Sequence, residues 1–110
     1  MSEINFDEFL KVDMRVGKII KAEAFERAKK PAYKLWLDFG ELGQKQSSAQ
    51  ITKYYSCEEL IGRLIVAVVN FPPKSIAGFK SEVLVMGSEH DGGVLLLSAD
   101  AGSVPGSRVF

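Results

Sequence analysis

The side chains best suited to chemistry lie in the segment that follows the longest apolar run of the chain. This segment, Asn70–Glu82, carries two phenylalanines, an isoleucine, two lysines and adjacent prolines, with no acid between Pro72 and Ser81. The prolines cannot donate ladder hydrogen bonds, so the chain must leave its sheet at Pro72. A stiff loop that mixes rings with positive charge indicates a contact surface for another molecule. The alternative is that Phe71, Ile76 and Phe79 fold back and cap a barrel, which would still leave the lysines exposed.

A second group of cations lies earlier in the chain. Six basic residues stand against only two acids, Asp38 and Glu41; they are Arg27, Lys29, Lys30, Lys34, Lys45 and Lys53. Lysines beside aromatic rings suit phosphates and stacked bases. Trp36 is predicted on the same side of its strand as Lys34. The alternatives are that the lysines are merely solvated, and that Trp36 closes a barrel end or fills a subunit interface.

Uncharged polar side chains fill the stretch Gln44–Thr52, which is unusual for a strand. Such side chains donate and accept hydrogen bonds, which suits ribose, bases or a peptide backbone. The alternative is a poorly buried strand with no binding role. The residues expected to contact RNA are the six cations above together with Ser47, Ser48, Lys74, Lys80 and Ser81.

Catalysis finds little support in the sequence. His90 is the only histidine and lies in a predicted turn, and Cys57 is the only cysteine. Together they cannot form a usual zinc site, and no phosphate-binding glycine motif is present. We therefore expect no catalytic residue, no metal and no cofactor. Cys57 is expected to be a buried structural thiol that a helix N-terminus could slightly acidify.

Regular elements must position these residues, and their order indicates the fold. Strands are predicted over Met14–Phe25 (bent near Gly17), Tyr33–Gly40, Lys45–Thr52, Leu64–Val69 and Glu82–Met86, and a further strand over Val94–Leu97 follows the turn Glu89–Gly93. Short helices are predicted at Phe6–Leu10 and at Ser56–Gly62, where Ser56 and Glu59 can form a capping box.

A helix between the third and fourth of five strands is the layout of an all-β OB-fold, a five-stranded Greek-key barrel, here with extra terminal elements. A small sandwich or another small barrel is the alternative. In an OB barrel the second and third strands and the loops after strands one and four line the usual binding face. Most of the cations fall there.

Composition limits the function classes. The 110 residues fit one domain, 1–110, and 14 bases balance 14 acids, so any nucleic-acid binding must come from local clustering. A core this small gains from a partner subunit. No secretory signal or membrane span is visible, and a single cysteine fits a reducing cytoplasm.

Several motifs resemble a known family. Asp13–Ile19 resembles the Asp-x-Arg-Val-Gly opening of the tRNA-binding domain shared by free tRNA-binding proteins, some methionyl-tRNA synthetase tails and endothelial-monocyte-activating-type cytokines. The pattern continues in order over nearly the whole chain at Glu59–Gly62, Val69–Asn70, Ala77–Glu82 and Pro105–Ser107. Two longer strings, Lys45–Thr52 and Asn70–Val85, are similar to the CsaA branch of secretion chaperones.

The resemblance implies a cytoplasmic OB-fold homodimer that binds unfolded or precursor polypeptides and the export ATPase. The expected peptide contacts are Phe71, Ile76, Phe79 and Trp36. The alternative is a module that binds tRNA by shape and charge. The strings at Lys45–Ile51 and Ser81–Leu84 depart from the tRNA-binding pattern on the expected RNA face, which favours the chaperone.

Overall fold

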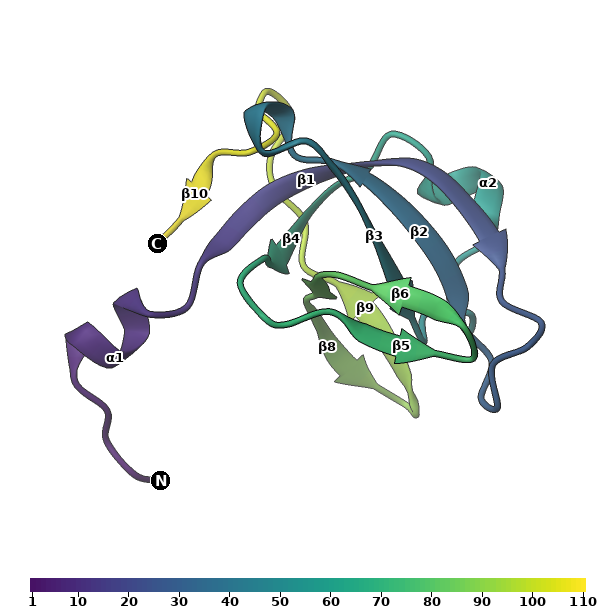
Figure 1. Cartoon of the computed structure of the whole chain (residues 1–110), viewed down its shortest axis with the longest axis horizontal. Coiled ribbons are helices and arrows are strands. Elements are labelled where there is room, and N and C mark those ends of the chain that lie inside the picture. The colour runs from purple at the N-terminus through teal and green to yellow at the C-terminus, as the bar shows by residue number, and fades with distance from the viewer.

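Strands dominate the computed structural model, which describes residues 1–110 (Figure 1). The elements in chain order are α1 (Phe6–Leu10), β1 (Met14–Ala24), β2 (Tyr33–Asp38), the 3-10 turn η1 (Gly40–Leu42), β3 (Gln44–Ala49), α2 (Cys57–Leu60), β4 (Leu64–Val68), β5 (Lys74–Ile76), β6 (Phe79–Ser81), β7 (Leu84–Val85), β8 (Gly87–His90), β9 (Gly93–Leu96) and β10 (Arg108–Val109). None of the helices is long and apolar enough to cross a membrane.

The main sheet confirms the predicted all-β OB barrel. Its strands lie in the antiparallel order β3-β2-β1-β4-β7, with β10 paired to the start of β1 and α2 between β3 and β4 in the chain. Side chains and backbone of the residues before β7 close the barrel onto β3. The Ser47 hydroxyl donates to the Val83 carbonyl at 2.7 Å, and the Glu82 amide donates to the Gln46 carbonyl at 2.8 Å.

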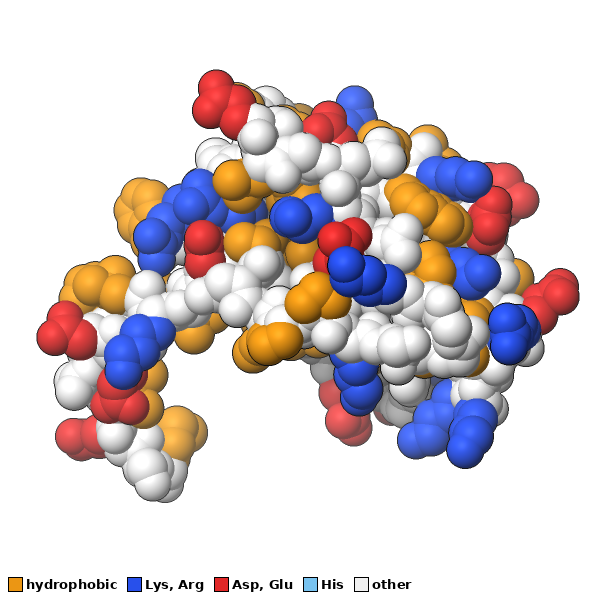
Figure 2. All heavy atoms as spheres, viewed as in Figure 1, with side chains coloured by type: hydrophobic (Ala, Val, Ile, Leu, Met, Phe, Trp, Pro, Cys, Tyr) orange, Lys and Arg blue, Asp and Glu red, His pale blue; other side chains and the backbone are white.

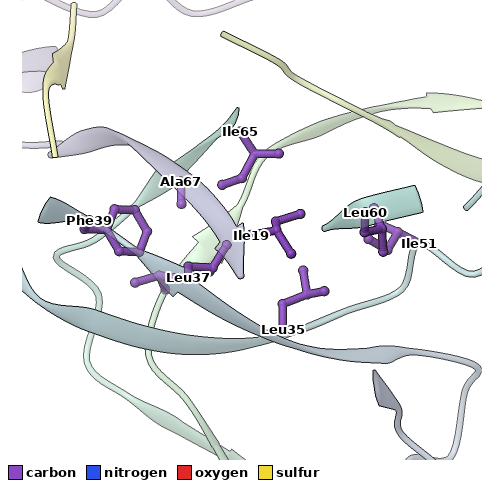
Figure 3. Close-up of a cluster of buried hydrophobic side chains, with 9 residues drawn as sticks. Ile19, Leu35, Leu37, Phe39, Ile51, Leu60, Ile65 and Ala67 are labelled. Carbon is purple, nitrogen blue, oxygen red and sulfur yellow. The ribbon is translucent and has the colours of Figure 1, made fainter. Parts of the chain in front are cut away.

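The alternation predicted for β2 is confirmed and defines the two faces of the sheet. Leu35, Leu37 and Phe39 are fully buried, whereas Lys34 and Trp36 lie half-buried on the opposite face. Figure 3 shows the buried side chains converging with those of β1, β4 and α2 inside the barrel. Because successive strand residues point to opposite faces, the same alternation that fills the core sends Lys34 and Trp36 outward.

The helix α2 begins as the sequence predicts. The Ser56 hydroxyl accepts from the Glu59 amide, and the Glu59 carboxylate accepts from the Ser56 amide at 2.8 Å. This capping box satisfies two amides that have no partner inside a helix. It seats Leu60, which is fully buried, at the base of the core.

Three details differ from the sequence-based expectation. The register of β1 against β2 shifts between Ile19 and Lys21, whereas the pairing of β1 with β4 runs unbroken through Gly17, near which the bend was expected. The strand expected over Glu82–Met86 is only Leu84–Val85, because the residues before it bond to β3 instead. Leu84, expected to be buried, is half-exposed.

The segment after the prolines also holds more structure than expected. It leaves the main sheet, as predicted, but then folds into its own hairpin of β5 and β6. Ala77 and Gly78 form its two-residue turn, both with positive φ, which is the turn geometry that suits the twist of a hairpin. The rings and lysines of this segment therefore have fixed places.

Replacing Ser47 with alanine is expected to destabilise the barrel by about 1–3 kcal/mol, because the buried Val83 carbonyl would lose its hydrogen-bond donor. Urea unfolding monitored by tryptophan fluorescence measures this. Ser48→Ala is the matched control, since the Ser48 hydroxyl donates no hydrogen bond. Equal losses of unfolding free energy in the two variants would show that the hydrogen bond from Ser47 to Val83 does not contribute specifically to stability.

Candidate functional site

One side of the barrel carries a groove with mostly apolar walls, about 430 Å³ in volume. We call it the apolar groove. It is lined by Phe71, Pro72, Ile76, Val83 and Leu84, together with Ser48, Lys74, Ser81 and Glu82. Phe71 and Leu84 keep 53% and 50% of their surface exposed. Apolar side chains held open to water in a concave wall are a typical binding site for an apolar group.

A second groove of about 440 Å³ lies beside the first, and we call it the basic groove. Its walls contain three cations and no acid; the lining residues are Arg27, Ala28, Lys29, Lys30, Ala32, Ser48, Gln50, Ile76 and Ala77. In Figure 2, Lys and Arg side chains gather where the β1–β2 loop protrudes, and hydrophobic side chains gather near the β4–β5 connection. Ser48 and Ile76 line both grooves.

The β5–β6 hairpin forms the wall common to both grooves and is fixed to β3. The Gln46 side-chain amide donates to the Lys80 carbonyl at 2.8 Å, and the Ser48 amide donates to the Ser81 hydroxyl at 3.2 Å. These bonds attach the hairpin across the free edge of β3. The grooves are therefore formed before a ligand arrives.

Rings and ammonium groups fasten the hairpin to the outer face of β1 and β2. Phe79 meets Phe25 and Trp36 edge-on, with ring centroids 5.5 and 5.8 Å apart. The Lys34 ammonium lies 5.0 Å from the Phe25 centroid and 5.2 Å from that of Phe79, and Lys21 lies 4.8 Å from that of Trp36. These five residues are the ring cluster. Ammonium groups so placed are attracted by the ring faces.

The residues expected to bind peptide have separate roles in the structure. Phe71 is exposed, and Ile76 lines both grooves. Phe79 and Trp36 are half-buried against each other in the ring cluster. Phe79 therefore packs back onto the barrel, as the alternative in the sequence analysis proposed for the rings of this loop. Phe71 does not, and stays exposed.

Several of the residues expected to bind RNA do lie together. Arg27, Lys29 and Lys30 line the basic groove, and Lys74 and Ser81 line the apolar one. Ser48 borders both grooves. Lys34 belongs to the ring cluster, and Lys80 is exposed on the hairpin next to Phe79 and Ser81.

Three others do not join this surface. Ser47 is only 1% exposed, and its hydroxyl donates to the Val83 carbonyl. Its side chain is therefore not available to RNA, which corrects the expectation from the sequence. Lys45 pairs with Leu37 and shares its face of the sheet, opposite to Lys34. Lys53 donates to the Asp91 carbonyl at the β8–β9 turn. Lys45 and Lys53 were grouped with the other cations because they are close in sequence, but the fold places them away from the two grooves.

Sequence reasoning missed Lys21, Phe25 and Leu84. Lys21 pairs with Trp36 only because of the register shift before it, and no simple alternation from the start of β1 predicts that face. Leu84 looked like part of a buried strand. Phe25, the last apolar residue before the Arg27–Lys30 cations, was the one available signal for a ring beside them.

The Asp13–Gly17 motif has a structural role. Arg15 donates to the Asp13 carboxylate at 2.7 Å and to the Gly106 carbonyl at 3.1 Å. The Asp13 hydrogen bond raises the pKa of Arg15, so the guanidinium stays charged. The motif thereby ties the C-terminal segment to β1, on residues that line neither the apolar nor the basic groove.

The structure offers no acidified nucleophile. Cys57 is half-buried, not fully buried as expected. This partial burial raises the pKa of its thiol, and the charges of Glu58 and Glu23 raise it further, so the slight acidification expected from the helix N-terminus is wrong. His90 is exposed, 3.5 Å from the Asp91 carboxylate. No group of His, Cys, Asp and Glu side chains is placed to hold a metal ion.

Because its pKa is raised, Cys57 is expected to react with iodoacetamide more slowly than an ordinary thiol at pH 7.5, and its rate is expected to climb only at higher pH. The pH dependence of the alkylation rate measures this, with the urea-unfolded chain as the matched control. A rate midpoint below that of the unfolded chain would contradict the expectation.

Comparisons with known proteins agree with one another. A family model described as a putative tRNA binding domain matches residues 14–108. The crystal structure of the chaperone CsaA from Bacillus anthracis str. Ames superposes with a TM-score of 0.94 at 54% identity, covering 99% of this chain and 100% of that one. A MetRS-related protein from Pyrococcus horikoshii superposes with a TM-score of 0.89 at 34% identity, covering all of both chains.

A methionine–tRNA ligase from Archaeoglobus fulgidus is 36% identical over 107 residues. The alignment covers 97% of this chain but only 16% of the ligase. The similarity is thus to one domain of a far longer enzyme.

Proposed function

Since the chain belongs to the tRNA-binding-domain family and to its CsaA-type branch, we propose that it is a non-catalytic chaperone for unfolded or precursor polypeptides in protein export. One observation carries this proposal: the apolar groove holds Phe71 and Leu84 half-exposed in a pre-formed wall. An apolar side chain of a client would cover both.

The expected affinity follows from the size of the groove. Burying one large apolar side chain contributes about 1.5–3 kcal/mol. A groove of about 430 Å³ lies at the small end of the range for ligand pockets, so it admits only a few such side chains. After the cost of ordering an unfolded segment, binding is weak and reversible, which suits a client that must be released.

We further propose that the protein works as a homodimer. The helix α1 stands away from the barrel (Figure 1), and Ile4, Phe6 and Leu10 are exposed there. Its base is held firmly, because Arg108 donates to the Leu10 carbonyl at 3.0 Å and the Asn70 amide donates to the Lys11 carbonyl at 2.7 Å. A fixed arm with exposed apolar residues fits a second copy of the chain.

Cytoplasmic location and an encounter with the export ATPase belong to the same proposal. The likeness to CsaA-type proteins and the single free cysteine support the first. A chaperone with weak, reversible binding could pass its client to such an ATPase. Only the likeness to CsaA-type proteins supports this second partner.

The proposal is tested by titrating fluorescent peptides from unfolded precursors into the full-length protein, followed by anisotropy. Saturable binding that an unlabelled unfolded peptide competes away is the expected result. Absence of any peptide binding would refute the chaperone function. In parallel, material captured from cell extract is sorted into polypeptide and RNA.

A tRNA-binding module is the second candidate, and the basic groove with the adjoining ring cluster favours it. Its signature is tRNA affinity whose log–log salt slope is about −0.7 to −0.9 per phosphate contacted. Lys30→Glu should flatten that slope, whereas Lys45→Glu, outside both grooves, should flatten it less. Affinity that ignores salt would exclude this candidate.

A further inference from the structure

We propose that the apolar and basic grooves together bind one extended polypeptide segment, selecting segments in which apolar residues adjoin acidic ones. The apolar side chains occupy the apolar groove, and the carboxylates face Arg27, Lys29 and Lys30. This inference rests on the proposed chaperone function and adds to it the class of client.

The two grooves lie side by side and together offer one path for an extended segment. Ser48 and Ile76 line both grooves, so the grooves are neighbours, and a bound segment that crosses these two residues passes from one groove into the other. A segment that places one side chain against Phe71 therefore runs directly past Ile76 towards Ala77 and Arg27. The path is polarised, because one end is mainly apolar, with Lys74 and Glu82 of opposite charge beside it, and the other end carries three cations and no acid.

Charge complementarity identifies the second half of the ligand. Arg27, Lys29 and Lys30 have no ion-pair partner, because the ion pairs of the structure join Arg15 to Asp13, Lys21 to Glu23 and His90 to Asp91. No acid lines the basic groove. In a chain whose charges sum to zero, this local excess of cations is left for a ligand to balance.

A polypeptide fits this path better than RNA does. Every nucleotide carries a phosphate, so an RNA strand running the length of the path would bring a phosphate beside Val83, Leu84 and the Glu82 carboxylate. That contact would desolvate the phosphate against apolar walls, and the Lys74 ammonium of the same groove offers little compensation because Glu82 offsets its charge. A polypeptide can carry its charges at one end alone.

The test compares three labelled peptides that share one apolar segment and differ in the two residues beside it: acidic, amide or basic. The full-length protein is expected to bind the acidic peptide about three- to tenfold more tightly than the amide one, with the gap closing in high salt. The basic peptide is expected to bind most weakly.

Variants locate the effect. Arg27→Gln combined with Lys30→Gln should lower the affinity for the acidic peptide to about that for the amide peptide, and so abolish the preference. Lys18→Gln, an exposed cation that lines neither groove, is the matched control and should keep the preference. All these residues are solvent-exposed, so thermal melting should confirm that each variant folds.

The possible outcomes distinguish a failure of this inference from a failure of the proposed chaperone function. If all peptides bind but the acidic one has no advantage, or if the advantage survives in the double variant, the inference is wrong and the chaperone function stands. If no peptide binds, the chaperone function itself is wrong. If the double variant loses affinity for a tRNA fragment while its affinity for the acidic peptide is unchanged, the basic groove is an RNA site and the inference is overturned.

Discussion

Replacing both Phe71 and Leu84 with alanine is expected to weaken the binding of an unfolded peptide about 10- to 150-fold. Each side chain is about half-exposed in the free protein, at 53% and 50%. Covering the remaining surface of each contributes about 0.75–1.5 kcal/mol, roughly half the value for complete burial. Because about 1.4 kcal/mol corresponds to a tenfold change in affinity, the pair accounts for the predicted loss.

The measurement is anisotropy titration of the same labelled peptide into wild type and variant. Leu95→Ala with Leu97→Ala is the matched control, since these leucines are similarly exposed but line neither groove. The control should bind as wild type does. If both double variants lose affinity equally, peptide binding depends on general surface hydrophobicity and not on the apolar groove. Phe79→Ala is a poorer probe, because Phe79 also fastens the hairpin to Trp36 and Phe25.

Gly106→Ala is expected to be among the most destabilising single changes, lowering the free energy of unfolding by about 3–5 kcal/mol. Gly106 has a φ of +92°, which disfavours any side chain, and an added Cβ would lie 2.4 Å from the Phe39 carbonyl oxygen. That obstacle is backbone, which cannot rotate away. Strain and overlap therefore act together.

The comparison with Gly102→Ala separates the two contributions. Gly102 has a similar φ of +97° but open space around the added Cβ, so only backbone strain of about 1–2 kcal/mol is expected. Urea unfolding of both variants gives the difference. Equal destabilisation would mean that the approach of Gly106 to Phe39 has no energetic weight.

The close packing of Gly106 against Phe39 also gives the residues of the Asp13–Gly17 motif their structural role. Arg15 donates to the Gly106 carbonyl, and the Gly17 backbone leaves room for the Phe39 ring, whose Cε1 lies 2.7 Å from where a Cβ would be. The motif therefore identifies the fold and how its C-terminal segment docks. The apolar and basic grooves are built from other residues.

Most of the barrel could be predicted from sequence, because local rules decide it. The alternation of Leu35 and Leu37 with Lys34 and Trp36 fixed both faces of β2 correctly. The Ser56–Glu59 pair located α2. Its place between the third and fourth strands then indicated the OB barrel.

The site was harder to predict, because contacts distant in sequence create it. The register shift before Lys21 moves that residue onto the Trp36 face, and a period-two pattern cannot show such a shift in advance. Lys45 lies close to Lys34 in sequence, yet pairing with Leu37 turns it to the other face. The β5–β6 hairpin has its position through bonds to β3 and through the contacts of Phe79 with Phe25 and Trp36, all distant in sequence.

Chemical-shift mapping of the backbone amides tests the central claim most directly. The ¹⁵N-labelled protein is titrated with an unfolded peptide that joins an apolar segment to acidic residues. The expected result is a continuous set of shifted amides from Phe71 through Ile76 and Ser48 to Arg27, with the β8–β9 hairpin unaffected. Shifts centred on β8–β9, or no saturable shifts at all, would contradict the assignment of this path as the polypeptide-binding surface.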